Sequence, residues 1–339
     1  MNYKIVKLLP QDVLRIRIGE GRLDKVSVII HSDTLFSAIV NCYVKLFGEE
    51  CLDNFINRLL ISSLFYGLRI SNRTEDILFL PKPIVAINNI TKGLKRIEWV
   101  SVNLLKDIIS SFDGEKASSF DGEKAYIDTN RLSFLNPRFV ISKEEEFRTL
   151  PEQVEFVDTS LEPKVSIERS SNTASNLYFQ EELEIKSISL KDGVKLSPFL
   201  YFITKDIDRK FNGVLNLLME EGIGGERSSG KGAFTNWEED IIDISDTGDY
   251  GVLLSLATPR KEEVNNLVYY GLIKRDGFIY YNGPVGIKRK THFKILEGSL
   301  VRLPFIGENI EVSPVEDKRV ISYGKGLHWA LKVREINES

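Results

Sequence analysis

Hydrophobic and polar residues alternate at the start of the chain. Tyr3–Leu9 and Val13–Gly19 show a period of two residues, which is typical of half-buried β-strands. After His31 the apolar residues recur at helical spacing and cover much of the helix circumference. We therefore predict a largely buried helix over 33–47, with Ser32 or Asp33 as its N-cap.

Later segments continue this mixture of helix and strand periods. A second helix is predicted at about 49–60, and Phe211, Val214, Leu215 and Leu218 predict another over 211–221. The strands predicted around these helices are 65–70, 77–80, 183–188, 196–204 and 233–237.

The order of these elements predicts the fold class. Strand, helix, two strands, helix and strand is the ferredoxin-like order, and a similar series, without its last helix, restarts near Ile241. We predict an α+β protein with two tandem ferredoxin-like (RRM-like) domains, residues 1–240 and 241–339. The second series comprises a strand at 251–257, a helix at 261–270, a strand at 277–281 and final strands within 293–303 and 321–333.

A long insertion interrupts the first domain over about 81–180. Much of it reads as irregular, and it contains the octapeptide SSFDGEKA twice in tandem, which we interpret as a duplicated surface segment. Near its end, Pro163–Arg169 and Leu177–Gln180 flank a polar stretch. They predict a projecting hairpin that carries Lys164 and Arg169 near its tip.

Composition limits the possible functions. The net charge is −4 and the pI about 5.7, whereas free-standing nucleic-acid binders are usually basic. Any nucleic-acid contact is therefore expected to be local, and residues 284–334 carry ten Lys and Arg against five acids. The chain has two cysteines, no His/Cys cluster with metal-ligand spacing, no signal-peptide core and no membrane-length apolar run, so we expect a cytoplasmic protein without metal or cofactor.

A glycine-rich stretch, Gly222-Ile-Gly-Gly-Glu-Arg-Ser-Ser-Gly-Lys-Gly232, separates the predicted 211–221 helix from the next strand. Glycine permits tight turns and close approach of a ligand to the backbone, and successive N–H groups can form an anion-binding nest. We therefore predict a phosphate-binding loop. Its candidate ligand-binding residues are Gly222, Gly224, Gly225, Arg227, Ser228, Ser229, Gly230, Lys231 and Gly232.

A nucleotide is the first ligand to consider. The loop matches the P-loop pattern until its last position, where Gly232 stands in place of the magnesium-binding Ser or Thr. The loop also follows a helix and precedes a strand, the reverse of a P-loop. An NTPase is therefore disfavoured, although a glycine-rich helix cap remains the structural alternative.

Other residues are weaker candidates for contact with a phosphate chain. His31 and Ser32 stand at a helix N-terminus, where anions bind well, although a surface or capping histidine is an equal alternative. Arg15 and Arg17 alternate on one predicted strand and so share a face. Lys288, Arg289 and Lys290 form a basic turn that could also be solvated, and Tyr323 and Lys325 flank a glycine, with a half-buried strand tyrosine as the alternative.

Four of these stretches together resemble a known family. The segment His31–Ile39, the glycine-rich loop, Tyr323-Gly-Lys-Gly326 and the hairpin of residues 164–178 are similar to motifs of the RAMP proteins of CRISPR systems. The resemblance spans nearly the whole chain and is closest to the fourth subunit of type III-A (Csm) effector complexes, the RAMP subunit that binds the crRNA 5′ tag. The tandem octapeptide departs from the family pattern.

This resemblance implies two ferredoxin-like domains with the hairpin as a projecting thumb. It implies a non-catalytic RNA-binding and assembly subunit that acts in antiviral defence. The expected partners are the crRNA 5′ tag, the large polymerase/cyclase-like CRISPR subunit and the neighbouring backbone RAMP subunit, with no membrane involved.

Two other functions remain open at this point. A metal-independent RAMP endoribonuclease that processes crRNA precursors would use a general acid–base residue near the same loop, and His31 could fill that role. The sequence offers no evident partner base or nucleophile for it. The equivalent subunit of a type III-B complex would differ mainly in its partners.

Overall fold

The structure is a computed structural model of the 339-residue chain. It describes residues 2–18, 25–87, 92–110, 124–125, 129–146, 154–168, 170, 173–205, 208–279, 287–316 and 319–331. Most of the tandem octapeptide and Arg169 lie outside these residues.

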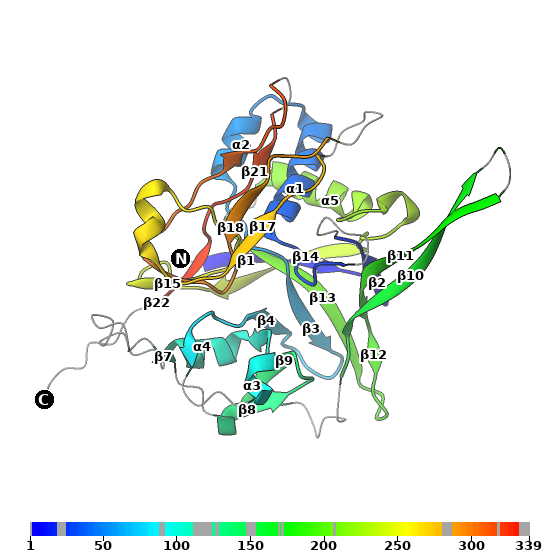
Figure 1. Ribbon diagram of the computed structural model, residues 1–339. Helices are drawn as coiled ribbons and strands as arrows, with labels where there is room; N and C mark the ends of the chain where they lie inside the picture. The colour runs from blue at the N-terminus through cyan, green and yellow to red at the C-terminus, as the bar shows by residue number, and fades with distance from the viewer. Residues whose placement is uncertain are drawn as a thin grey trace, which may run out of the picture.

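Two helices lie against one face of a large sheet (Figure 1). Within the described residues this sheet has nine strands in the order β14-β1-β13-β3-β4-β6-β9-β8, with β12 paired to β13. Helices α1 and α5 contact each other, and α5 also contacts β14. The elements of this half are β1 (Asn2–Leu9), α1 (Ser32–Phe47), α2 (Leu52–Arg58), β3 (Phe65–Ile70), β4 (Ile77–Pro81), β12 (Ile188–Ser189), β13 (Lys195–Thr204), α5 (Arg209–Glu221) and β14 (Asn236–Asp243).

Local patterns account for the ends of these elements. The predicted 33–47 and 211–221 helices are confirmed within two residues. Helix α5 begins after Asp208, whose carboxylate accepts a hydrogen bond from Phe211 N at 2.8 Å, and both helices end at a glycine with positive φ. The N-cap prediction for α1 is wrong, because His31 occupies that position and makes no side-chain cap bond.

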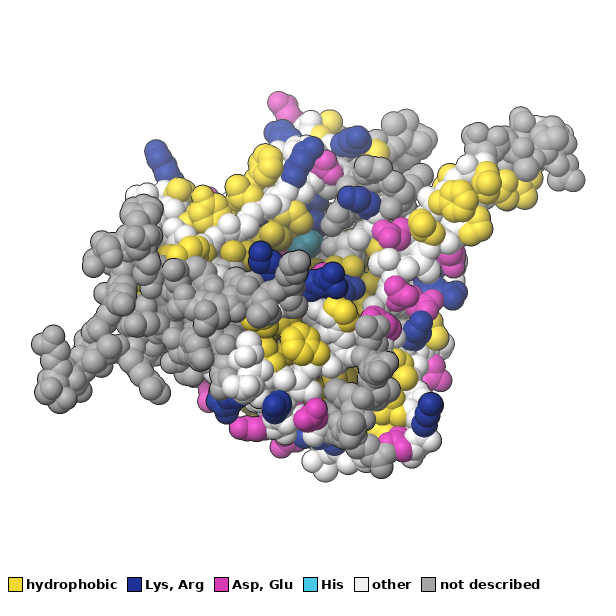
Figure 2. Space-filling view, turned by 60° about the horizontal axis from the view of Figure 1, so that its bottom comes forward, with side chains coloured by type: hydrophobic (Ala, Val, Ile, Leu, Met, Phe, Trp, Pro, Cys, Tyr) yellow, Lys and Arg dark blue, Asp and Glu magenta, His cyan; other side chains and the backbone are white. Residues whose placement is uncertain are grey.

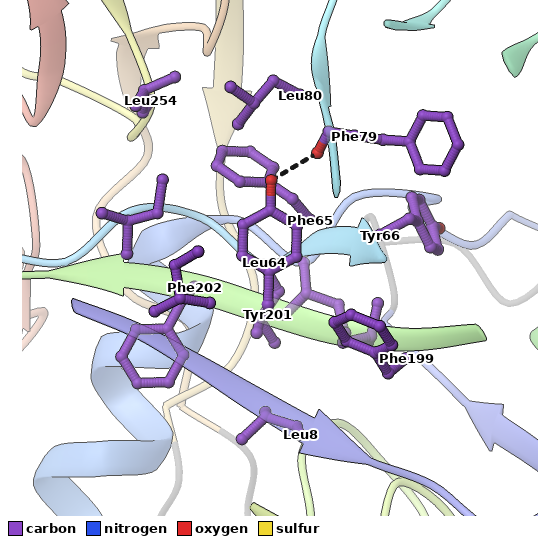
Figure 3. Close-up of a cluster of buried hydrophobic side chains, with 14 of the residues drawn as sticks. Leu8, Leu64, Phe65, Tyr66, Phe79, Leu80, Phe199, Tyr201, Phe202 and Leu254 are labelled. Atoms are coloured by element: carbon purple, nitrogen blue, oxygen red, sulfur yellow. Dashed lines mark hydrogen bonds between the residues drawn. The ribbon is translucent and has the colours of Figure 1, made fainter. Parts of the chain in front are cut away.

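The core of this half fills the space around β13 and β3 (Figure 3). Phe65, Phe199, Tyr201 and Phe202 are all essentially buried, and the Tyr201 hydroxyl donates to Phe79 O at 2.9 Å. That bond satisfies the one polar atom that the ring brings into the core, so the aromatic cluster carries no cost of an unsatisfied hydroxyl. Gly67 on β3 is required here, since a Cβ would come within 2.2 Å of the Phe199 ring.

The prediction of an irregular insertion is wrong for much of its length. Trp99, Phe139 and Val140 are buried, and β6 and β9 pair in parallel to extend the main sheet beyond β4. These short strands pair across some forty residues, which no local period can reveal. The elements are β5 (Ala86–Ile87), α3 (Lys92–Arg96), β6 (Trp99–Ser101), α4 (Val102–Ser110), β7 (Lys124–Ala125), the 3₁₀ turns Thr129–Arg131 and Lys143–Glu145, β8 (Leu132–Phe134) and β9 (Phe139–Ser142).

A long hairpin projects from the body of the molecule (Figure 1). It consists of β10 (Val157–Glu168) and β11 (Thr173–Lys186), and β2 (Val13–Ile16) pairs with the base of β11. Hydrophobic side chains gather along it (Figure 2), and on one face the cross-strand pairs Pro163–Phe179 and Val165–Leu177 are exposed. The strands predicted at 163–169 and 177–180 fall within β10 and β11, apart from Arg169. The one predicted at 183–188 covers the end of β11 and, after Ser187, the start of β12.

The C-terminal part packs on the outer side of α1 and α2 (Figure 1). The predicted 261–270 helix is wrong in its second half, where a 3₁₀ turn (Lys261–Asn266) leads into a strand. Of the strand expected at 277–281, residues 277–279 pair with residues 287–289, and the remainder lies outside the described residues. The elements are β15 (Tyr250–Leu253), β16 (Leu267–Tyr269), β17 (Leu272–Arg275), β18 (His292–Ile295), β19 (Leu300–Arg302), β20 (Ile310–Glu311), β21 (Ile321–Ser322) and β22 (His328–Leu331). Within the described part of the chain, no helix has the length and apolar character needed to cross a membrane.

Candidate nucleic-acid interface

A groove of about 520 Å³ lies where the glycine-rich loop, α1 and the β17 region meet. Its cationic side chains outnumber its carboxylates, and polar residues of α1 complete its wall. Such a surface suits a polyanion of modest length better than an apolar ligand. The charged residues of the groove are Arg17, Arg227, Lys274, Arg275, Arg289, Asp33 and Asp276.

Backbone contacts hold the glycine-rich loop against the strand β2. Gly225 N donates to Arg17 O and Gly232 N donates to Arg15 O, both at 2.8 Å, while Ile223 N closes the loop on Gly232 O. Gly224 has φ +100 and Gly232 φ +72, and a Cβ on them would lie 2.6 and 2.0 Å from carbonyl oxygens. Glycine is thus required at Gly224 for packing on the Arg17 backbone and at Gly232 for closure of the loop. Five of the candidate N–H groups donate within the protein, those of Gly222, Gly225, Ser229, Gly230 and Gly232.

The loop residues divide between two hollows. Gly222, Gly224, Gly225 and Arg227 line the groove together with Arg17. The second hollow, of about 420 Å³, is lined instead by Arg15, Ser229, Gly230 and Lys231. Arg15 and Arg17 therefore line different hollows, although the predicted alternation continues through Arg17, with Leu14, Ile16 and Ile18 buried and Arg17 in an antiparallel bridge to Gly225.

Lys231 lies in a cluster of carboxylates. Its ammonium is 2.8 Å from Glu226, 3.5 Å from Glu162 and in contact with the fully buried Glu182. Burial alone would lower the pKa of Lys231, but the hydrogen bonds and charges of these acids raise it above its ordinary value. The hydrogen bond from Lys231, despite an opposing effect of burial, lowers the pKa of Glu226 to about 2.

This cluster fastens the loop to the hairpin. Glu226 belongs to the loop, and its carboxylate also accepts from Gln180 Nε2 at 2.9 Å and Lys164 Nζ at 3.4 Å on the two hairpin strands. Lys164, opposite Tyr178, thus lies along the middle of the hairpin, where it reaches the loop. Both lysines serve as cross-links between elements in this structure.

The remaining donors of the loop belong to a 3₁₀ turn, Arg227–Ser229. The Ser229 hydroxyl donates to Glu226 O at 2.7 Å, and the Arg227 guanidinium lies 3.5 Å from Glu221 at the end of α5. Ser228 is exposed. Arg227 therefore faces the groove as a partly neutralised cation, and Ser228 stands at the surface beside it.

The start of α1 is tied to the C-terminal part. His31 is 3% exposed, and its Nδ1 donates to Glu297 Oε1 at 2.9 Å. Ser32 is fully buried, and its hydroxyl accepts from Leu256 N. His31 is the N-cap residue of α1, but its side chain is buried and caps no backbone N–H, and this burial argues against presentation to RNA as a ligand or a general acid–base residue.

Asp33 continues the same connection at the edge of the groove. Arg275 Nε and Nη2 donate to its two oxygens at 2.9 and 2.8 Å, and Arg289 lies 3.8 Å away. Burial would raise the pKa of Asp33, but Arg275, Lys294 and Arg289 outweigh it and hold this pKa well below its usual range. The carboxylate therefore stays ionised and orients the arginines of the groove.

The motif Tyr323-Gly-Lys-Gly326 also makes its contacts within the protein. Tyr323 is fully buried, its hydroxyl bonds to the backbone of Ile61, and its ring packs 5.3 Å from that of Phe36. Lys325 Nζ donates to Ile56 O, Asn57 O and Leu59 O at the end of α2. Base stacking by Tyr323 is excluded in this arrangement, and Lys325 caps a helix.

The basic turn lies partly in the groove. Arg289 donates twice to Asp276 O and lines the groove, whereas Lys290 is exposed outside it. Lys288 Nζ lies 5.5 Å from the centroid of the Phe278 ring. Of the three residues of this turn, Arg289 is the one that lines the groove together with other candidate residues.

Several groove residues were missed from the sequence. Lys274, Arg275 and Asp276 form a charged triplet just before the segment whose charge was counted, and Phe278 follows it. Counting charge from residue 270 would have included them. Thr34, Ser37 and Asn41 carry the helical spacing of one polar face of α1, a signal present in the sequence.

Comparison with known proteins defines the class. The model of the RAMP superfamily matches residues 15–235, which is more than half of the chain. The chain therefore belongs to the RAMP superfamily. Within it, residues 246–331 match the model of the CRISPR Csm4 C-terminal domain, and the chain is a Csm4 homologue.

Relatives and solved structures agree with this assignment. The "CRISPR system Cms protein Csm4" of Methanocaldococcus jannaschii is 28% identical over 93% of this chain and 90% of its own length, and that of Thermococcus onnurineus is 28% identical over 81% and 82%. A chain in a crystal structure of the Csm3–Csm4 subcomplex of a type III-A interference complex has a TM-score of 0.64 at 24% identity, covering 97% of this chain and 99% of its own. Another, in a Csm1–Csm4 cassette with pppApA, has a TM-score of 0.55 at 17% identity, covering 99% and 100%. At these identities the two structures establish a common fold.

Proposed function

We propose that this chain is the non-catalytic subunit of a type III-A CRISPR effector complex that holds the 5′ repeat tag of crRNA. The observation that carries the proposal is the groove beside the glycine-rich loop, where five cationic side chains meet two carboxylates. Its cationic and polar lining suits a single strand, whose phosphates set the register while polar side chains contact base edges.

The same proposal assigns the parts of the fold. We infer two ferredoxin-like domains that meet between β14 and β15, and the β10–β11 hairpin serves as the family's thumb. The strand order β14-β1-β13-β3, with α1 and α5 as the two helices, supports the first of these domains. Exposed apolar pairs along the hairpin support a contact surface.

Solved structures of similar chains support an assembly role. Structures of similar chains contain Csm3 or Csm1, so we propose that this chain docks a backbone RAMP subunit and the large polymerase-like subunit in antiviral defence in the cytoplasm. Co-purification of each subunit with this chain tests the docking separately from RNA binding. If the chain co-purifies with type III-B subunits instead, it would be the equivalent subunit of a type III-B complex.

RNA binding is tested by removing two cations from the groove. We expect R17A/R227A to weaken binding of single-stranded RNA that carries the 5′ repeat tag, and to reduce the slope of log K against log salt. The matched control, R131A/R138A, removes the same charge at exposed ion pairs near β8 and β9. Equal losses in both variants, or none in R17A/R227A, would show that the groove is not the RNA site.

A further inference from the structure

We propose that Phe278 is a base-stacking residue of the groove, an inference that rests on the proposed RNA-binding function. The side chain is 65% exposed although it is a large apolar ring, and it lines the groove. Exposure of an aromatic ring in a cationic groove is the arrangement that single-stranded nucleic-acid sites use, because every base presents a π-face.

Hydrogen bonds fix the backbone that carries this ring. Ile279 N donates to Ile287 O at 2.9 Å and Arg289 N donates to Gly277 O at 3.0 Å, so Phe278 and Lys288 face each other across a short antiparallel ladder. Gly277, with φ +120, turns the chain from Asp276 into this ladder. A ring presented by a hydrogen-bonded ladder loses little conformational entropy when a base stacks on it.

The surroundings of the ring favour RNA over an apolar protein surface. Lys288 Nζ lies over the Phe278 ring, 5.5 Å from its centroid, and the residue stays 65% exposed, so surface of the ring remains open to a base. Arg289 is anchored to Asp276 O by two hydrogen bonds, and Arg17 and Arg227 line the same groove. The ring therefore takes the base while neighbouring cations take its phosphates.

The test compares Phe278 with an aromatic residue of similar exposure that does not line the groove. Phe293, on β18, is 61% exposed and serves as that control. We expect F278A to weaken binding of 5′-tagged single-stranded RNA roughly 5- to 150-fold, with an unchanged salt slope because no phosphate contact is lost. F278W should retain the affinity, and F293A should bind as the wild type does.

Abasic RNA identifies the stacked position. In a series of tagged RNAs with one abasic site each, one position should weaken binding to the wild-type protein but not to F278A, and 2-aminopurine there should be quenched only when the ring is present. A uniform loss for F278A at all positions, or equal effects of F278A and F293A, would overturn the proposal. If R17A/R227A weakens binding while F278A does not, the stacking inference fails alone, and if neither does, the proposed function fails with it.

Discussion

Asp33 at the start of α1 and Arg275 at the end of β17 form a bidentate ion pair across 242 positions of sequence. Asp33 is 3% and Arg275 7% exposed, so the pair is shielded from water. It joins the N-terminal helix to the C-terminal part and forms one edge of the groove. The geometry of the candidate RNA site therefore depends on a contact between the two halves of the chain.

Breaking this pair should be costly. We expect R275M to lower the free energy of unfolding by about 3–5 kcal/mol, because it leaves the buried Asp33 carboxylate without its main partner. The control, R319M, breaks an exposed pair with Asp53 and should cost about 0–1 kcal/mol. Urea unfolding of the two variants measures both values, and similar small losses would show that the pair contributes little.

The neighbouring buried Lys294 should make the free energy of unfolding change with pH in the alkaline range. Burial lowers the pKa of Lys294 to about 8, in a site that also contains Asp33, Arg275, Arg289 and Glu297. Between this value and the unfolded pKa of about 10.4, the unfolded chain holds a proton that the folded chain has released, so stability from this group rises with pH. Below pH 8 the full cost of the buried charge is present.

Removing the ammonium should remove that dependence. Relative to K294M, the wild-type protein should gain on the order of 3 kcal/mol as the pH rises from 8 to 10.5. Chemical unfolding of both proteins at several pH values measures the difference. If the free energies of unfolding of the two proteins change with pH in parallel, the lowered pKa of Lys294 is not the cause.

The sequence predicted the elements whose evidence is local. Helices α1 and α5 and strand β1 were predicted within two residues, because a period and a boundary residue lie within each segment. The strands within the insertion were missed, because β6 and β9 are short, buried and paired with distant strands. Chain order alone does not specify such pairing.

The same limit applies to the site. His31 could be recognised as the residue before a helix, but its partner Glu297 is 266 positions away. Lys231 reads as a phosphate ligand until the hairpin brings Glu162 and Glu182 onto it. A charge in a motif can therefore be assigned to ligand or to structure only when its neighbours in space are known.

The salt dependence of RNA binding separates these two roles for the loop cations. R227A should weaken RNA binding and reduce the salt slope by about 1, as expected for one lost phosphate contact. K231M should weaken binding with an unchanged slope, because Lys231 already faces three carboxylates and acts by positioning the loop. Titrations at several salt concentrations measure the slopes.

Removal of one of those carboxylates completes the test. E182Q, which leaves Lys231 in place but weakens its anchor, should lower the affinity as K231M does if both act through loop position. A reduced slope in K231M would instead identify Lys231 as a phosphate ligand.

Two adjacent glycines of the loop should respond differently to substitution. Gly224 has φ +100 and a Cβ there would lie 2.6 Å from Arg17 O, whereas the nearest atom to a Cβ on Gly225 is 3.7 Å away. We expect G224V to displace the loop from β2, lowering both the thermal midpoint and RNA affinity with no change in charge. G225A should leave both nearly unchanged, since its Cβ has room and its N–H still reaches Arg17 O. Thermal unfolding and RNA titration of the two variants measure the contrast, and equal tolerance at both positions would mean that the loop is not held by its contact with β2.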